Sequence, residues 1–315
     1  MKRIFKKIGK NLKMMRLYGA EAVVGAHLEG LFYKLFGKDF WYIRRRHAAK
    51  NRKLMQQYEH IKDGLVPADS YAPIPRDGKI WFMWWQGADH YPEAVKVALA
   101  SIKKNCGQHE VVELSQHNVE QYITIPADIK EKFAQKKISI THYSDIIRFT
   151  LLSEYGGIWM DSTLLLARPF PEEFYEKAFF SVKRKEVRNT YISAGRWTTF
   201  FVACGKDNIL PRFCRDFLID YWRHNNKLVD YTILDYSLHI GYENVPAMRE
   251  LIDEVACSNT HVSRMVGLLN HPFDETLFEE MKADTYLFKL SWKETYKKEV
   301  DGKETFFGHL VREGL

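Results

Sequence analysis

A chain of 315 residues is long enough for two domains, or for one large domain with an appendage. With 46% hydrophobic and 28% charged residues, 18 glycines and 10 prolines, it is not collagen-like, of low complexity or disordered. Its four cysteines include no CxxC pair, so they indicate neither a zinc cluster nor a disulfide framework and favour a reducing cytoplasm.

Basic charge is concentrated at the amino end. Residues 1–62 carry 16 Lys and Arg against 4 Asp and Glu, a net charge of +12, whereas the remainder carries a net charge of -5. A nucleic-acid enzyme more often spreads basic charge over its binding face. The asymmetry therefore argues against nucleic acid as a partner and favours docking of the head to an anionic surface such as phospholipid head groups.

Residues 1–16 have the pattern of a basic amphipathic helix, with apolar side chains every three or four residues among lysines. Such a helix can lie in a membrane interface, or it can pack on its own domain. Charges interrupt the apolar stretch 20–36, so we expect neither a signal peptide nor a membrane-spanning segment. The predicted location is cytoplasmic, peripheral on the inner face of the cell membrane. A second basic run, residues 44–53, is either a solvated helix face or a further docking surface.

The segment 67–75 holds three prolines and is predicted to be a linker, which separates a basic helical region, 1–75, from a domain at 76–315. The second domain opens with an apolar strand at 79–85, a helix ending near Asn105 and a strand at 111–114. A strand, a helix and a strand within about 35 residues form a βαβ unit. The predicted fold class is therefore α/β with a parallel sheet.

One carboxylate interrupts an apolar run. A helix at 142–155, apolar over most of its circumference, ends at two glycines, and the strand-like segment 158–166 follows with Asp161 at its centre. A buried carboxylate needs a partner. A strand ending at Asp161 would present it, with Ser162 and Thr163, to a metal ion or a ligand hydroxyl. Alternatively, Asp161 caps a turn between two short strands.

Asp145 and Arg148 stand three residues apart on the preceding helix and can reach each other. They form either a simple intrahelical ion pair or, together with Asp161, a polar group at one cleft. Asp235 and His239 likewise share a helical face, which suits a metal pair, a general base or a plain surface contact.

Several motifs carry a resemblance in the same order. His142-Tyr-Ser-Asp145-Ile-Ile-Arg148, then Glu154-Tyr-Gly-Gly-Ile-Trp-Met-Asp161-Ser-Thr163, resembles the capsular polysaccharide synthesis proteins and the wider DxD-motif sugar-binding glycosyltransferases, which include yeast α-1,6-mannosyltransferases. The segment Trp84-Trp85-Gln86-Gly87 resembles the end of the opening strand of that family, and Tyr286 to Trp292 its closing segment.

The resemblance implies a GT-A-like, Rossmann-type fold and a UDP-linked nucleotide-sugar donor. It implies a glycan or lipid-linked saccharide acceptor in capsular or surface polysaccharide synthesis. Asp161 would contact the ribose and a Mn²⁺ or Mg²⁺ ion, and Lys289 the pyrophosphate. The donor-binding set implied or suggested comprises Trp85, Gln86, Gly87, Asp145, Arg148, Gly157, Asp161, Ser162, Ser193, Lys289 and Trp292. The catalytic set comprises Asp145, Arg148, Asp161 and Asp235, and the metal ligands would be Asp161, Thr163 and His239.

Thr163 departs from the motif because it stands where the second acid should be. Hard divalent cations favour carboxylate oxygens, so either another group completes the metal site, or Lys289 and arginines neutralise the diphosphate instead. The predicted function is nucleotide-sugar-dependent hexosyl transfer. The alternatives are a sugar-phosphate transferase of capsule assembly and a non-catalytic scaffold that binds a sugar nucleotide at the membrane. No Ser/His/Asp set or GxxxxGK[ST] loop supports a hydrolase or a P-loop kinase.

Overall fold

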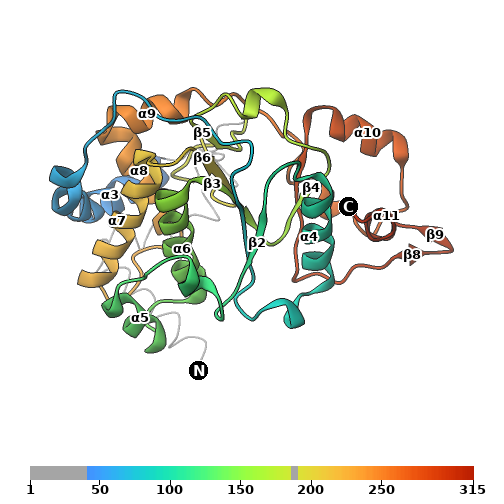
Figure 1. The fold of residues 1–315 in the computed structure, drawn as a ribbon, viewed down its shortest axis with the longest axis horizontal. Coiled ribbons are helices and arrows are strands. Elements are labelled where there is room, and N and C mark those ends of the chain that lie inside the picture. The colour runs from blue at the N-terminus through green and yellow to red at the C-terminus, as the bar shows by residue number, and fades with distance from the viewer. Residues whose placement is uncertain (1–40, 186–190) are drawn as a thin grey trace.

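A computed structural model describes residues 41–185 and 191–315 of the chain. The remaining residues are drawn as a grey trace in Figure 1. The amphipathic helix predicted for residues 1–16 therefore lies outside the described residues. Within the described part, no helix combines the length and the apolar character needed to cross a membrane.

The centre of the molecule is a five-stranded sheet with the strand order β2-β1-β3-β6-β5. Strands β1 (Ile80–Met83), β2 (Val111–Leu114) and β3 (Gly157–Asp161) are parallel to one another. Strand β6 (Phe201–Cys204) runs antiparallel to them, and β5 (Phe179–Ser181) pairs antiparallel with β6, so β5 runs in the same direction as the first three. Helix α4 (Glu93–Asn105) connects β1 to β2, so the predicted βαβ unit and the α/β fold class are confirmed. The architecture is consistent with a GT-A-like fold.

The apolar run predicted as one strand at 158–166 is in fact two strands. Strand β3 ends at Asp161, Ser162 and Thr163 form a turn, and β4 (Leu164–Leu166) leaves the central sheet. Strand β4 pairs antiparallel with β7 (Leu287–Lys289) in a separate two-stranded sheet. The break follows from the carboxylate, because a charged group at the middle of a buried strand would lose its hydration without compensation.

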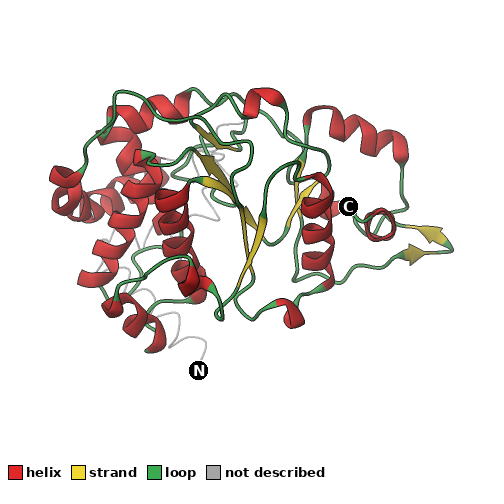
Figure 2. Ribbon diagram, viewed as in Figure 1, coloured by secondary structure: helices red, strands yellow, loops and turns green. Residues whose placement is uncertain are grey.

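Helices surround the sheet, as Figure 2 shows. Helices α5 (Ala127–Ala134), α6 (Ile140–Tyr155), α7 (Ile209–His224), α8 (Ile233–Asn244) and α9 (Pro246–Asp253) lie on one side of the view in Figure 1, with α7 packed against α6 and α8. Helix α4 lies on the other side and packs on β4. The main core fills the space between the helices and the central sheet.

Helix α3 (Trp41–Ile61) packs on α7 and α8. Its Leu54 is fully buried in the main core, and so is Ile74 of the predicted linker. Lys50 of the second basic run is buried and forms an ion pair with the partly buried Asp230, whereas Arg44 is exposed. Residues 41–75 thus share the core of the larger domain, and the basic run at 44–53 is divided between solvent and a structural ion pair.

The carboxyl-terminal part of the chain forms a second, smaller core next to β4 and β7. It contains α10 (Glu275–Asp284), the hairpin of β8 (Glu299–Val300) and β9 (Lys303–Glu304), and α11 (Phe306–Glu313). Val97 of α4 and Leu165 of β4 belong to this core as well. The β4-β7 pair therefore joins the carboxyl-terminal part to the edge of the sheet where Asp161 lies.

Candidate active site

Helix α6 holds Asp145 and Arg148 inside the protein. Ser139 caps its amino end by accepting a hydrogen bond from the backbone N–H of His142, and nearly every later side chain of the helix is buried. Asp145 is 8% exposed and Arg148 6% exposed. Two ionic groups at this depth require partners, because each has lost most of its hydration.

Strand β3 carries Asp161 at its carboxyl end. The strand begins at Gly157, which has a φ of +89° and lies against the backbone of Lys79; a Cβ there would come within 2.4 Å of the Lys79 carbonyl oxygen. Gly157 therefore fixes the start of β3, and the structure places it at the opposite end of the strand from Asp161. Gly157 makes no recorded contact with the Asp161 cluster, so its predicted donor-binding role stays a prediction.

Asp161 accepts hydrogen bonds from two cations and an indole. Its Oδ2 lies 2.9 Å from the ammonium nitrogen of Lys289, and its Oδ1 lies 3.0 Å from Nη2 of Arg148 and 3.0 Å from Nε1 of Trp159. Lys289 reaches Asp161 because β7 pairs with β4 directly after the turn. The structure thus brings together three residues predicted for the donor site from three separate elements.

Arg148 is held on several sides. Its Nη2 lies 3.6 Å from Oδ1 of Asp145, its Nη1 donates to the carbonyl of Thr199, and its guanidinium lies 4.8 Å from the ring centroid of Trp159. Its buried Nε has no hydrogen-bond partner within the described part of the chain. The contact of Arg148 with Asp145 on one helix and the polar group that both form with Asp161, stated as alternatives from the sequence, are therefore both present.

The charges of this cluster shift the pKa of each carboxyl group. Burial alone would raise the pKa of Asp161, but the charges of Lys289 and Arg148 outweigh it and hold the pKa below its ordinary value. Burial raises the pKa of Asp145 to about 6; the charge of Arg148 opposes this shift and that of Asp161 adds to it. Asp161 is therefore ionised at neutral pH, whereas the pKa of Asp145 lies close to neutral pH.

Asp235 of α8 is an electrostatic neighbour of this cluster. Its Oδ1 accepts a hydrogen bond of 3.0 Å from Nε1 of Trp197. Burial raises the pKa of Asp235 to about 6; the bond from Trp197 opposes the shift and the charge of Asp145 reinforces it. A buried carboxyl with a pKa near 6 suits proton exchange with a substrate hydroxyl. The catalytic role of Asp235 stays a prediction.

His239, although one turn from Asp235, is engaged elsewhere. Its Nδ1 lies 3.1 Å from Nη2 of Arg196 and 4.0 Å from a carboxylate oxygen of Glu243. Burial, together with the charge of Arg196, lowers the pKa of His239 to about 4. The recorded contacts of His239 include neither Asp161 nor Thr163, so the three predicted metal ligands are not seen as one group.

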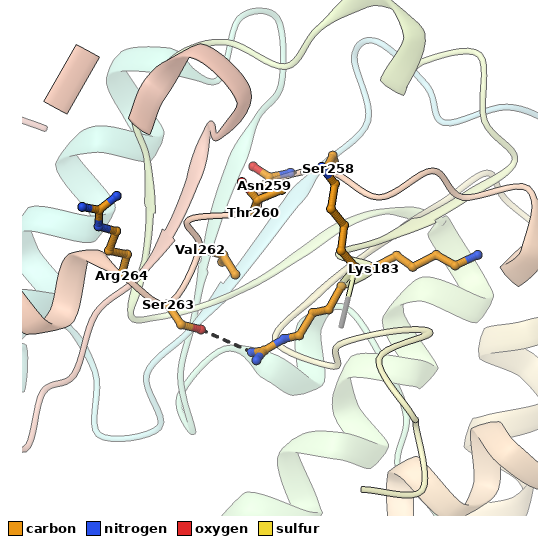
Figure 3. Close-up of a pocket in the computed structure, with 9 residues that line it drawn as sticks. Lys183, Ser258, Asn259, Thr260, Val262, Ser263 and Arg264 are labelled. Atoms are coloured by element: carbon orange, nitrogen blue, oxygen red, sulfur yellow. Dashed lines mark hydrogen bonds between the residues drawn. The ribbon is translucent and has the colours of Figure 1, made fainter. Parts of the chain in front are cut away.

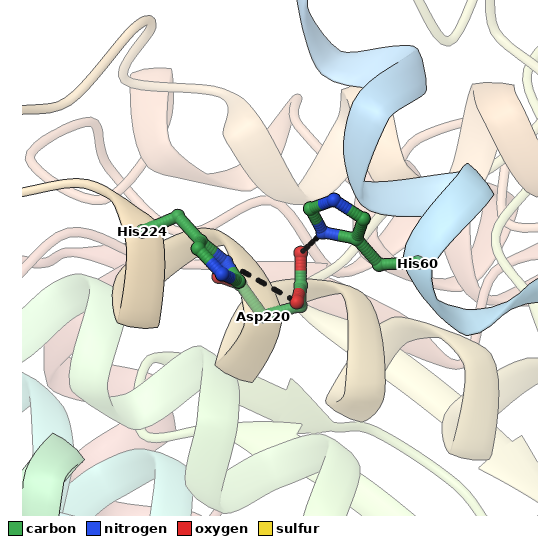
Figure 4. A group of neighbouring side chains, drawn as sticks. All are labelled: His60, Asp220 and His224. Carbon is green, nitrogen blue, oxygen red and sulfur yellow. Dashed lines mark hydrogen bonds and ion pairs between the residues drawn. The ribbon is translucent and has the colours of Figure 1, made fainter.

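The residues around Asp161 fit a divalent metal ion poorly. Thr163 is buried in the turn after Asp161 but supplies a hydroxyl, and both oxygens of Asp161 already bind cationic side chains. Among the described residues, the one group of three or more His, Cys, Asp or Glu side chains close enough to hold a metal ion is His60, Asp220 and His224, where α3 meets α7 (Figure 4). None of these residues belongs to the Asp161 cluster.

The residues after β1 leave the sheet at the same end as Asp161, because Met83, the last residue of β1, pairs in register with Asp161, the last residue of β3. Trp85 is half-buried and packs edge-on against Phe133 and Tyr143, with ring centroids 5.3 Å and 5.7 Å apart. Gln86 is exposed, and Gly87 follows it with a φ of +91°. This segment lies at the carboxyl ends of the parallel strands, where α/β proteins bind ligands, and its predicted donor-binding role stays a prediction.

The other predicted donor-binding residues lie near this edge or on a neighbouring loop. Trp292, which is 48% exposed, follows β7 and packs edge-on against Trp84 with ring centroids 5.6 Å apart. Ser162 forms the turn after Asp161. Ser193 lies in the loop before Trp197, and its carbonyl oxygen accepts a hydrogen bond of 3.0 Å from Arg196. Their roles in binding remain predictions.

Two tryptophans of the site were not singled out from the sequence. Trp159 contacts both Asp161 and Arg148, and Trp197 binds Asp235. Trp159 stands two residues before Asp161, so the alternation of a strand puts the two side chains on the same face, and this spacing could have identified it. The sequence offers no comparable signal for Trp197, because its partner comes from another element.

The fold and the cluster together define an α/β protein with a charged site at the carboxyl ends of its parallel strands. Residues 40–310 match the capsular polysaccharide synthesis protein family. This match covers most of the chain, and the chain belongs to that family.

The chain is also similar to two proteins whose names include glycosyltransferase. An O-glycosyltransferase named braB, from Annulohypoxylon truncatum, is 26% identical over 151 residues, which cover 41% of this chain and 36% of that protein. The chain thus matches about a third of the length of that relative. The solved structure of the PaToxG glycosyltransferase aligns with a TM-score of 0.39 and 12% identity, over 77% of this chain and 98% of that one. The family and the name of the braB relative agree with the glycosyltransferase class expected from the sequence.

Proposed function

We propose that the protein transfers a hexosyl group from a nucleotide-sugar donor, a UDP-sugar, to a glycan or lipid-linked saccharide in surface polysaccharide synthesis. The observation that carries this proposal is the Asp161 cluster. An ionised carboxylate lies beside an ammonium and a guanidinium at the carboxyl ends of parallel strands, where α/β proteins bind ligands.

In this proposal, Lys289 and Arg148 neutralise the charge that develops on the leaving diphosphate. Both cations are positioned before any substrate arrives, so little reorganisation is needed during the reaction, and such preorganised charges contribute much of an enzyme's rate enhancement. Asp161 keeps the two cations in place and accepts hydrogen bonds from donor hydroxyls.

In this arrangement, the ammonium of Lys289 supplies the positive charge that a metal ion would otherwise supply. A Mn²⁺ or Mg²⁺ ion would neutralise the diphosphate in a metal-dependent enzyme, but the threonine at position 163 and the cations on Asp161 do not provide its ligands. We therefore propose nucleotide binding that persists in EDTA. Asp235, with a pKa of about 6, is the group we propose to accept the proton of the acceptor hydroxyl.

The first experiment is calorimetric titration of UDP, GDP and CDP into the full chain, with Mn²⁺ and again with EDTA. We expect UDP to bind in both conditions. Binding that requires Mn²⁺ would overturn the role given to Lys289 while leaving the donor site intact. If none of the three nucleotides binds, the glycosyltransferase proposal loses its main support. The alternative of a non-catalytic scaffold that binds a sugar nucleotide would then be contradicted as well.

The second experiment follows the reaction with UDP-sugars. Release of UDP supports glycosyl transfer, whereas release of UMP supports the sugar-phosphate transferase. We expect Asp161→Asn to lower activity at least about a hundredfold, or roughly 2.7 kcal/mol, because the cations lose their fixed positions. Asp69→Asn, at an exposed carboxylate of the linker, is the matched control. Full activity of a folded Asp161→Asn variant would contradict the assignment.

A further inference from the structure

A pocket of about 350 Å³ is lined mainly by basic and hydroxyl side chains (Figure 3). Its walls are two segments, 183–185 and 258–264. Four of its lining residues are cationic and none is acidic; the cations are Lys183, Arg184, Lys185 and Arg264.

These four cations form no ion pair with any carboxylate of the described residues. Lys183 donates to the backbone carbonyl of Asp253 over 3.4 Å, and Nη2 of Arg184 donates to the Ser263 hydroxyl over 3.2 Å. The carboxylate of Asp284, which contacts the 258–264 segment, is bound by the hydroxyls of Thr260 and Thr285. Like charges gathered without a counter-charge favour an anionic ligand.

Both walls are fixed before any ligand binds. The 258–264 segment follows the edge of β7: Oδ1 of Asn259 accepts hydrogen bonds from the backbone N–H groups of Tyr286 and Leu287, at 2.9 Å and 3.0 Å. Lys183 pairs with Cys257 in an isolated parallel bridge. The Arg184 to Ser263 bond then joins the two walls, as the dashed line in Figure 3 shows. Preorganised walls reduce the entropy lost when a ligand binds.

Two connections link the pocket to the candidate active site. Val262, in the pocket wall, accepts a hydrogen bond of 2.7 Å from the backbone N–H of Lys289, whose ammonium binds Asp161. The backbone N–H of Arg184 donates to the carbonyl of Gly195 over 2.8 Å, in the loop that leads to Trp197 and hence to Asp235. The pocket walls are therefore joined by backbone hydrogen bonds to the strand that carries Lys289 and to the loop before Trp197.

We infer that the basic pocket binds a phosphate or diphosphate group of the acceptor substrate. The identity of the ligand as an acceptor substrate rests on the proposed function. The inference that the pocket binds an anion rests only on the residues that line the pocket. Lysine and arginine side chains together with serine and threonine hydroxyls are the donors that recognise phosphate oxygens. The phosphate belongs either to the diphosphate of a lipid-linked saccharide or to a phosphodiester within a glycan.

The first test is calorimetric titration of inorganic pyrophosphate into the full chain. Lys183→Gln combined with Arg184→Gln should weaken binding at least about tenfold, because two charge-assisted contacts are removed. Lys96→Gln combined with Lys137→Gln, at exposed lysines outside the pocket, makes the same change in charge and should leave the affinity unchanged. Equal affinity of the two double variants would overturn the inference, whether or not the chain transfers sugar.

The second test separates the pocket from the donor site. Lys289→Gln should weaken UDP binding and leave the pyrophosphate bound in the pocket. The pocket variant, Lys183→Gln combined with Arg184→Gln, should weaken pyrophosphate binding and leave UDP binding unchanged. If UDP fails to bind the unmodified chain while pocket-dependent pyrophosphate binding persists, the proposed function fails and the anion site remains. If the pocket variant weakens UDP as strongly as pyrophosphate, the pocket belongs to the donor site and the inference of an acceptor site is overturned.

Kinetics with two soluble acceptors distinguish the sources of the phosphate. One is a short-chain prenyl diphosphate saccharide and the other a phosphodiester-containing oligosaccharide. We expect the pocket variant to raise the KM of the acceptor that carries the matching phosphate about tenfold, with kcat and the donor KM unchanged. A lower kcat with both KM values unchanged would contradict a binding role for the pocket.

Discussion

Asp161 determines the chemistry of the site because it is a buried carboxylate bound to two cations. With Arg148, Lys289 and Asp145 it forms a nearly neutral group of four charges, so no single charge is left uncompensated inside the protein. Removing one member would leave its partners buried without a counter-charge, which costs more than the pair contributes. The group thus stabilises the fold, and we propose that it also binds the anionic donor.

Asp235 offers a test at the same scale. Its folded-state pKa of about 6 exceeds that of an unfolded chain, so the native state binds the extra proton as the pH falls. Stability from this group is therefore present at low pH and is lost as the pH rises from about 4 to about 6. Relative to Asp235→Asn, which can still accept the Trp197 hydrogen bond, the unmodified chain should lose roughly 2 kcal/mol of unfolding free energy over that range.

Urea unfolding of both proteins at several pH values measures this difference. The depressed pKa of Asp161 has the opposite effect, a loss of stability as the pH falls, but that effect is common to both proteins and cancels in the comparison. Asp69→Asn, at an exposed site, should follow the unmodified chain at every pH. A constant difference between the unmodified chain and Asp235→Asn would show that the Asp235 carboxyl is not perturbed by burial.

Strand β3 is the element on which the site depends. It starts at the close approach of Gly157 to Lys79, runs between β1 and β6, and stops at Asp161, where the chain turns away to pair with β7. The separate β4-β7 pair is what carries Lys289 to Asp161. A continuous strand through 158–166 would have kept the chain in the central sheet and left the carboxylate without this partner.

Gly157→Ala tests that start point. The new Cβ would meet the Lys79 carbonyl at 2.4 Å and would also require an alanine at a φ of +89°. We expect a loss of more than about 3 kcal/mol in unfolding free energy. Gly302→Ala is the matched control: its φ of +73° is equally unfavourable, but no atom lies within 4 Å of the new Cβ, so it should cost only about 1 kcal/mol. Equal losses would mean that the Lys79 contact does not constrain β3.

At the scale of the whole molecule, charge is divided between a basic head and a slightly acidic body. The head includes residues 1–40, which lie outside the described residues, and α3, which packs on α7 and α8. Of the basic residues in the head, nine lie in residues 1–40. We propose peripheral attachment to the inner face of the cell membrane through this segment.

Deletion of residues 1–18 tests this attachment. The segment carries seven Lys and Arg and no acidic residue. Its loss should lower binding to vesicles of phosphatidylcholine and phosphatidylserine at least about tenfold in a sedimentation assay, because each basic residue contributes up to about 1 kcal/mol near an anionic surface. Binding of the full chain should also weaken with added salt. Salt-sensitive binding that survives the deletion would place the docking surface elsewhere, with the exposed Arg44 as the next candidate.

The sequence by itself determined the α/β class and the βαβ unit, and it singled out Asp161, Asp145 and Arg148, which the structure brings together. These follow from local rules: hydrophobic periodicity, the spacing of residues on one helix, and the cost of burying a charge. Only the tertiary structure decided that the apolar run breaks after Asp161, that Lys289 binds it from β7, that Trp197 holds Asp235, and that His239 faces Arg196 instead. Such contacts join residues far apart in the chain, and no local pattern encodes which distant side chain will satisfy a buried charge.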